Sequence, residues 1–344
     1  TTVALAQAET MEVFQPIFSE KNPKIGKQLT PANPSEFEEI LYQLASKLVG
    51  KPYQLGALGE GPGSEHPEPL YRLDVFDCTT FLETVMANAL CYGAGSKAGH
   101  CLARRMLEIR YSGKKVQFRA RNHIPELDWL PHNTKRGLLR DLSQGLFEGE
   151  WRTAEVTIDR DLWLASRNAS ELKAKDVSRK SPLPGSRISY LPISFFFEKY
   201  PLSSEEREKI EADLAAKDEE IRTKKQDVKL SSSERDQLVK EKFRAELAYL
   251  RAAYKPLYER LIKIPSGTVL NLIRAEEKDL KKAKITPLVA HQGLIIQRAQ
   301  GARFLHAAAN SGHVQEQDLG DYLLRYLRSA NFRGISLYQI LPKK

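Results

Sequence analysis

The run from Thr79 to Leu90 leaves the least choice of structure in this sequence. Its apolar residues recur at steps of three and four, the period of an α-helix with one buried face. They are Phe81, Leu82, Val85, Met86, Ala89 and Leu90. Asp77, just before the run, and Thr79 and Thr80, at its start, are of residue types that commonly cap helix starts. We therefore expect a helix that begins beside Cys78 and packs one face into a core.

Cys78 stands at the predicted helix start. There, unpaired backbone N–H groups and the positive end of the helix dipole favour the thiolate, which is the reactive form of cysteine. Cys78 is therefore a candidate nucleophile. A buried structural cysteine is the alternative interpretation, and this stretch alone leaves both open.

The length of 344 residues and the charge limit the classes of function. The formal net charge is +9, but 53 basic residues are scattered among 44 acidic ones, so we predict no nucleic-acid partner. No stretch approaches the roughly 20 consecutive apolar residues of a membrane helix, so we predict no integral membrane segment.

Residues 1–34 are interpreted as an N-terminal segment that carries the remnant of a secretory signal peptide. Ala6-Gln7-Ala8 matches the small-x-small cleavage pattern, which predicts export of the protein. An ordinary alanine-rich start is the alternative. Three cysteines cannot all pair within one chain. Either Cys91 pairs with Cys101 and leaves Cys78 free, or all three remain thiols.

Several further elements follow from the pattern. We expect a helix at residues 35–49 capped by Ser35, a helix at 103–109, and strands at 116–120, 151–158 and 188–197. Polar and aromatic residues crowd a loop-like stretch between 119 and 133. That density favours a binding surface, with a solvated loop as the alternative. Its candidate residues are Arg121, His123, Asp128 and Trp129. No second ligand pair accompanies His123 and His132, so we predict no metal site.

Residues 203–262 change character. Ser203 and Ser231 are each followed three residues later by glutamate, the pattern of a capping box, so two helices should start there. An apolar seam runs from Val239 to Leu261. We interpret the segment as an inserted helical hairpin, which either braces the main domain or binds a protein partner.

The last third predicts strands at 268–273, 288–297, 303–308 and 335–341 and a helix at 319–327. Residues 288–297 and 303–308 should form an antiparallel hairpin in which Gln297 faces Ala302. This register places His291 and His306 on one sheet face, one diagonal step apart. A shift by one residue would separate the two rings.

A helix-start cysteine and two histidines that can meet on a sheet supply a nucleophile, a base and an orienting group. Four motifs then carry a family resemblance: Gly50-Lys51-Pro52-Tyr53, Phe76-Asp77-Cys78-Thr79-Thr80-Phe81, His291-Gln292-Gly293-Leu294 and Leu305-His306-Ala307. In order and spacing they resemble the NlpC-type cell-wall hydrolases. The form Phe-Asp-Cys-Thr-Thr-Phe, with Arg121-Asn122-His123 through Asp128-Trp129 and Tyr190-Leu191-Pro192, resembles the N-acetylmuramoyl-L-alanine amidase-like branch.

The resemblance implies an α+β fold with a papain-like core, in which the cysteine helix packs on an antiparallel sheet. The catalytic domain would span 35–202 and 263–344, with the hairpin inserted between. One departure is that Gly267-Thr268 stands where the family usually has Gly-Asp.

The resemblance also implies the roles of the site residues. Cys78 is the nucleophile, His291 the general base and acid, and His306 the group that orients His291. Tyr53 and Asp77 belong to the oxyanion or substrate-binding site. The polar cluster of Arg121, His123, Asp128 and Trp129 offers charge and stacking to the substrate. No metal or organic cofactor is implied.

The expected function is hydrolysis of the amide bond between N-acetylmuramic acid and L-alanine in peptidoglycan or its muropeptides. Two alternatives remain open. One is an endopeptidase that cuts between D-glutamate and diaminopimelate. The other is a non-catalytic cell-wall-binding or adaptor protein that acts through the helical hairpin.

Overall fold

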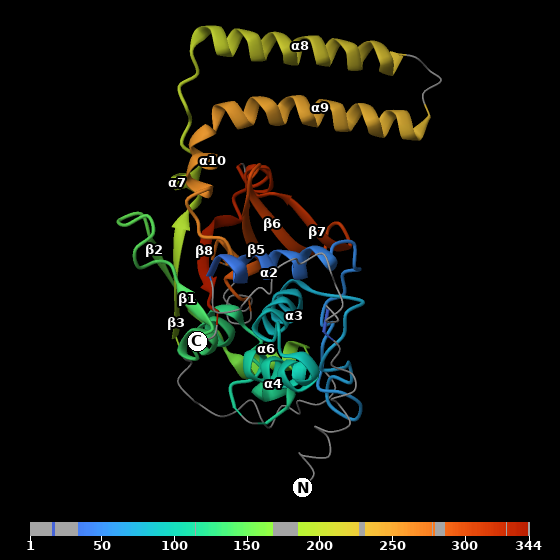
Figure 1. Cartoon of the computed structure of the whole chain (residues 1–344). Coiled ribbons are helices and arrows are strands. Elements are labelled where there is room, and N and C mark those ends of the chain that lie inside the picture. Colours follow the sequence, from blue (N-terminus) through green and yellow to red (C-terminus); the bar gives the residue numbers. More distant parts are fainter. Residues whose placement is uncertain are drawn as a thin grey trace.

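The fold, seen in a computed structural model, is α+β, with one antiparallel sheet between two groups of helices (Figure 1). The structure describes residues 16–17, 34–113, 115–167, 185–226, 231–276, 278, 286–327 and 329–342. The signal-like residues Ala6-Gln7-Ala8 lie outside these ranges. Within them, no helix combines the length and the apolar character needed to cross a membrane.

Eight strands of the described chain form the sheet. They are β1 (Leu139–Asp141), β2 (Arg152–Thr157), β3 (Gly185–Pro192), β4 (Thr268–Arg274), β5 (Val289–Arg298), β6 (Gly301–Ala308), β7 (His313–Asp318) and β8 (Phe332–Ile340). Their order is β2-β3-β8-β4-β5-β6-β7, and β1 pairs with β8 outside this path. All neighbours are antiparallel.

The helices of the described chain lie on both sides of the sheet. They are α2 (Pro34–Lys47), α3 (Cys78–Leu90), α4 (Ala98–Arg110), α5 (Leu130–Lys135), α6 (Arg160–Arg167), α7 (Ile193–Phe196), α8 (Ser204–Gln226), α9 (Ser232–Ala253), α10 (Lys255–Leu261) and α12 (Leu319–Leu324). Short helical turns are η1 (Gly95–Lys97), η2 (Phe118–Ala120) and the π-helical η3 (Pro125–Trp129).

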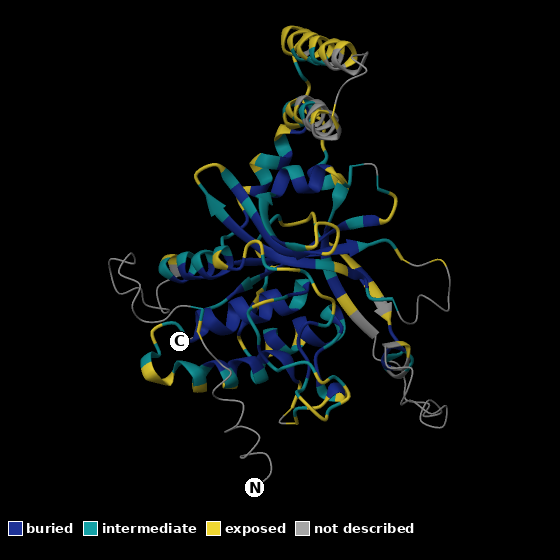
Figure 2. Cartoon of the chain, turned by 90° about the vertical axis from the view of Figure 1, so that its right-hand side faces the viewer, coloured by how far each residue is buried: buried dark blue, intermediate teal, exposed yellow. Residues whose placement is uncertain are grey.

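Alternation of side chains along the strands creates two cores. On β5, Leu294 and Ile296 pack into a core with α2, α3 and α4, whereas Ile295 packs into a second core with α7, α10 and α12. Figure 2 shows the central strands and the helices beneath them as mostly buried. The sheet is thus covered on both faces, and α3 packs on β5 and β6.

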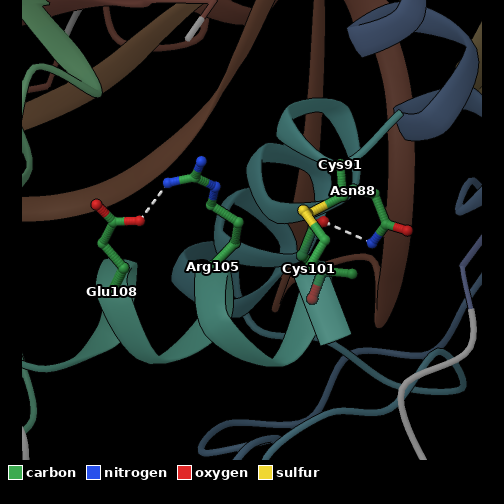
Figure 3. Close-up of a disulfide and its surroundings, with 6 residues drawn as sticks. Asn88, Cys91, Cys101, Arg105 and Glu108 are labelled. Atoms are coloured by element: carbon green, nitrogen blue, oxygen red, sulfur yellow. Dashed lines mark hydrogen bonds and ion pairs between the residues drawn. A yellow bond between two sulfur atoms is a disulfide. The ribbon is translucent and has the colours of Figure 1, made fainter. Parts of the chain in front are cut away.

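A disulfide joins the end of α3 to α4. Cys91, the residue that caps α3, is bonded to Cys101 of α4, and Cys78 is the free cysteine (Figure 3). Beside it, the Asn88 amide donates to the Thr84 carbonyl oxygen at 2.8 Å. The open question of cysteine pairing is therefore settled in favour of one disulfide, which ties down the far end of the helix that begins at Cys78.

Most predicted elements are confirmed. The helix after Asp77 is α3, the strand at 151–158 is β2, and both serine capping boxes form, at Ser203 and Ser231. Gln297 faces Ala302 as the predicted register requires. The helix expected to be capped by Ser35 begins at Pro34 instead.

Other expectations are wrong. Within the strand expected at 116–120, residues 118–120 form the short helix η2 instead, and the loop-like stretch 119–133 contains η3 and the start of α5. The run at 188–197 stops being a strand at Pro192, where α7 begins. Strands β1 and β7 carry too few apolar residues to be recognised without their sheet partners.

The helices α8 and α9 lie side by side as an antiparallel pair, set apart from the sheet (Figure 1). Residues 227–230, between them, lie outside the described ranges. Most described side chains of α8 are exposed (Figure 2). Near its base, Arg251 of α9 pairs with Asp321 of α12, where the Arg251 Nε lies 2.8 Å from the carboxylate.

Candidate functional site

The start of α3 is fixed by Asp77. Its carboxylate accepts hydrogen bonds from the Thr80 N–H at 2.8 Å and from the Gly56 N–H at 3.0 Å. The Thr80 hydroxyl in turn accepts from the Asp77 N–H at 2.9 Å, which completes a capping box. Asp77 therefore caps the helix and holds the preceding loop against it, which places Cys78 at the first helical position.

Cys78 is half-buried, and its sulfur lies 3.9 Å from the Thr79 hydroxyl. Burial, together with the Asp77 charge, raises the pKa of Cys78 to about 11, while backbone groups of Gln292 and Thr79 act in the opposite direction. Cys78 is therefore a neutral thiol at neutral pH, although the helix start alone predicts a thiolate. Within the described residues no hydrogen bond joins the sulfur to His291.

The two histidines meet as the register predicts. His291 Nε2 lies 2.6 Å from His306 Nδ1, which leaves His291 Nδ1 as the nitrogen outside this contact. Burial lowers the pKa of His291 to about 4 and, with the charges of His291 and Arg325, lowers that of His306 to about 2. Both rings are therefore neutral at neutral pH.

A chain of hydrogen bonds ties the first turn of α3 to the sheet. The Thr79 hydroxyl donates to the Gln292 side-chain oxygen at 2.8 Å, and the Gln292 amide donates to the Asn271 oxygen at 2.7 Å. Gln292 and Asn271 are fully buried. Sequence reasoning missed this chain; the only signal was a glutamine and an asparagine inside otherwise apolar strands.

Cys78 and His291 line the same cavity, whose volume is about 470 Å³. Asp77, Arg121 and His123 also line it. Four rings extend the wall: His66, Phe118, His123 and Trp163. The cavity thus brings together the candidate nucleophile Cys78, the candidate base His291 and part of the polar stretch.

Arg274, at the end of β4, also lines this cavity. Among the described residues its Nε has no hydrogen-bond partner. Arg110 and Arg121, the other arginines of the lining, are each bound to backbone carbonyls and to a carboxylate. Arg274 therefore adds a positive charge to the cavity lining, which also acts on the buried Glu126 carboxylate, and sequence reasoning did not single it out.

Arg121 and His123 line the cavity but are held within the protein. Arg121 donates to the Leu58 carbonyl at 2.6 Å and pairs with Glu60 at 3.1 Å. His123 Nε2 lies 2.6 Å from the Phe118 carbonyl oxygen, so this nitrogen carries the ring proton. Burial, reinforced by the Arg121 charge, lowers the pKa of His123 to about 2. His123 therefore offers the cavity a neutral ring.

Asp128 and Trp129 are placed outside the cavity lining. Asp128 accepts from the His123 N–H at 3.2 Å and pairs with Arg160. Trp129 is fully buried and donates its indole N–H to Glu83 at 3.1 Å. Both side chains therefore contact residues that line the cavity without lining it themselves.

Tyr53 lies near Cys78 without lining the cavity. Its backbone pairs with Phe76, two residues before Cys78. Burial, followed by the charges of Cys78 and Asp77, raises the pKa of Tyr53 to about 12. Its hydroxyl therefore keeps its proton and can donate a hydrogen bond near the sulfur.

Among the described residues, no group of three or more His, Cys, Asp and Glu side chains could hold a metal ion. His132, one of the two histidines weighed as ligands, has its Nδ1 2.8 Å from the Asn122 oxygen.

Comparisons with solved structures support the fold. A protein from Legionella pneumophila is 23% identical, with a TM-score of 0.63 over 90% of each chain. An N-acetylmuramoyl-L-alanine amidase from Bacteroides uniformis is 17% identical, with a TM-score of 0.55 over 89% of this chain and 99% of its own. No curated protein sequence matches the chain.

The comparison with family models is more specific. Residues 43–196 match the AmiA-like family, described as N-acetylmuramoyl-L-alanine amidase-like. This range includes Cys78 and the polar stretch, whereas His291 and His306 lie beyond it. The segment of this chain that carries the candidate nucleophile is thus similar to a family of N-acetylmuramoyl-L-alanine amidase-like proteins.

Proposed function

We propose that this protein is a cysteine-dependent amidase that cleaves the bond between the lactyl group of N-acetylmuramic acid and L-alanine in muropeptides. The observation that carries the proposal is that Cys78 and His291 line one cavity, with His306 2.6 Å behind His291. The amidase-like match of residues 43–196 supports the choice of bond.

In the reactive tautomer, in which His291 Nδ1 carries a lone pair, the Cys78 proton is transferred to His291 Nδ1, and the sulfur attacks the lactyl carbonyl carbon. The backbone N–H of Cys78, at the start of α3, and the Tyr53 hydroxyl donate to the developing oxyanion. His291 then gives its proton to the L-alanine nitrogen, and the C–N bond breaks. Water, activated by His291, hydrolyses the lactyl thioester and releases the sugar acid.

The cavity can accommodate both parts of such a substrate. The rings of His66 and Trp163 provide apolar surface for a sugar or a lactyl group. Arg274 provides a positive charge for a carboxylate of the stem peptide. We expect this positive charge to favour stem peptides that carry free carboxylates. The arginine supplies the charge itself, so no metal ion is needed for this contact.

Three wider expectations belong to the same proposal. The packing of α3 on β5 and β6 is consistent with a papain-like core of the NlpC type. The segment 203–262 then counts as an insertion between two parts of one catalytic domain. The Cys91–Cys101 disulfide favours an oxidising compartment, either the periplasm or the exterior of a bacterial cell.

Digestion of a defined disaccharide–tripeptide muropeptide, analysed by mass spectrometry, tests the function. The expected products are the free disaccharide and a peptide that begins with L-alanine. An endopeptidase would instead leave the sugar attached to a dipeptide. Cys78→Ala and His291→Ala should abolish cleavage, whereas His100→Ala, which changes an exposed histidine of α4, should retain it. Unchanged cleavage by Cys78→Ala would contradict the proposal.

A further inference from the structure

The outer nitrogen of His306 faces two glutamine side chains of β7. The Gln317 amide nitrogen lies 2.6 Å from His306 Nε2, and the Gln315 amide nitrogen lies 3.2 Å from it. His306 pairs directly with Gln315 in the sheet, and Gln317 lies two residues along the same strand. Alternation therefore directs both glutamines to the face that carries His306.

The amide orientation determines the tautomer of His306. An amide NH2 group can only donate, so His306 Nε2 must accept and the ring proton must lie on Nδ1. His306 Nδ1 then donates to His291 Nε2. A neutral His291 that accepts there carries its own proton on Nδ1, the nitrogen outside the His306 contact, which in the proposed mechanism serves Cys78. In this arrangement His291 has no free lone pair with which to take the thiol proton.

If the Gln317 amide flips, each donor in this chain of hydrogen bonds becomes an acceptor and each acceptor becomes a donor. If the Gln317 oxygen faces His306, Nε2 becomes the donor and Nδ1 the acceptor. His291 then donates from Nε2 and presents a lone pair on Nδ1 to Cys78. The same arrangement also accommodates a protonated His291, because His306 can accept its second N–H.

We propose that Gln317, assisted by Gln315, is a positioning residue that selects the tautomer of His306 and thereby decides whether His291 meets Cys78 as a base or as a hydrogen-bond donor. The structure shows the arrangement in which the Gln317 amide nitrogen faces His306. The inference rests on the proposed roles of Cys78 and His291 and adds a residue that acts through His306 without touching substrate.

The other groups around the histidine pair do not set this tautomer. The Tyr322 ring packs 5.1 Å from the His306 ring, and its hydroxyl is paired with Tyr326 at 3.1 Å. Arg325 acts on His306 only through its charge. Among the described residues, the two glutamines are the hydrogen-bonding partners of His306 Nε2.

NMR of the histidine ring nitrogens in the isotope-labelled full chain tests the tautomer directly. The His306 signals are assigned as those that disappear in His306→Asn. The wild type should carry the His306 proton on Nδ1. Gln317→Glu replaces the amide by a carboxylate, which only accepts, and should move the proton to Nε2. If Gln317→Glu fails to fold, Gln315→Glu places the same acceptor near the same nitrogen. The same tautomer in wild type and folded variant would overturn the inference.

Alkylation of Cys78 by iodoacetamide at neutral pH provides a second, substrate-free measurement. Gln317→Glu should increase the rate about tenfold, the ratio that corresponds to a shift of one pKa unit. Gln300→Glu, the same change in the exposed turn after β5, should leave both measurements unchanged. A rate increase without a tautomer change would assign the effect to charge alone and refute the inference.

These readouts separate the inference from the proposed function. If muropeptides are not cleaved but the tautomer moves, the amidase assignment fails and the role of Gln317 stands. If muropeptides are cleaved and the tautomer does not move, the reverse holds.

Discussion

The Thr79 hydroxyl donates a 2.8 Å hydrogen bond to the side-chain oxygen of Gln292. Thr79 follows the candidate nucleophile Cys78, and Gln292 follows the candidate base His291. The bond therefore joins the two neighbours of the reacting pair, across the contact between α3 and β5. In the proposed mechanism the thiol proton moves between Cys78 and His291, so this bond would help to hold the two residues in place.

Thr79→Val should lower kcat about 10- to 100-fold with little change in KM, because loss of this bond lets the two reacting groups drift apart. It should also lower the free energy of unfolding by about 1–3 kcal/mol, since a buried acceptor loses its donor. Thr84→Val is the matched control in the same helix. Within the described part of the chain, the Thr84 hydroxyl is buried without a hydrogen-bond partner, so its removal should cost neither activity nor stability.

Arg274→Met should raise KM about tenfold for a muropeptide with free stem carboxylates, which is the scale of one charge-assisted hydrogen bond. The change in kcat should be small, because Arg274 belongs to the cavity wall and not to the reacting pair. Steady-state kinetics with carboxylate and amidated stems measures this. Arg333→Met, which removes a cation paired with Glu276 outside the cavity lining, should leave KM unchanged. Equal KM values for Arg274→Met and the wild type would contradict the predicted contact between Arg274 and a stem carboxylate.

Trp129→Phe should lower the free energy of unfolding by about 1–3 kcal/mol because Glu83 loses its buried indole donor. KM should not change, since Trp129 does not line the cavity. Urea unfolding and kinetics on the same preparation distinguish the two effects. A raised KM with unchanged stability would instead restore Trp129 as the substrate contact that the sequence suggests.

Replacement of both Cys91 and Cys101 by alanine should destabilise the fold by about 3 kcal/mol, the loop-closure term for a bridge with a sequence separation of 10. Reduction of the wild type should reproduce this loss, as followed by urea unfolding with and without reductant in a Cys78→Ala background. If reduction has no effect on unfolding, the bridge does not constrain the chain.

Acid should destabilise the protein through its buried histidines. Burial lowers the pKa of His123, His291 and His306 to about 2, 4 and 2 from 6.5, so below pH 6.5 the unfolded chain binds protons that the folded one does not. The raised pKa values of Glu83 and Glu126 act in the opposite direction above pH 4.5. The net loss between pH 6.5 and 4.5 should be about 1–3 kcal/mol and become steeper below.

Urea unfolding at several pH values measures this slope. His123→Asn should flatten it by one proton, whereas His100→Asn, which changes an exposed histidine, should not. An unchanged slope in His123→Asn would show that His123 is protonated in the folded state.

Local patterns were sufficient to predict α3, the capping boxes and the hairpin register, because each depends on residues close in the chain. The 3.6-residue period places Phe81 and Val85 on one face of α3, and the period of two places His291 and His306 on one face of the sheet. The sequence could not identify β7, whose residues are mostly polar and become a strand only by pairing with β6.

Backbone periodicity alone predicts the helix that begins at Cys78 and the face of the sheet on which His291 and His306 meet. Which polar groups face the cavity depends instead on how distant segments of the chain pack together. Trp129 and Asp128 turn away from the cavity, whereas Arg274 and Gln292 come to it from strands far along the chain. The tertiary structure also decided the ionisation of Cys78, since desolvation in the folded protein outweighs the helix start and keeps the thiol neutral.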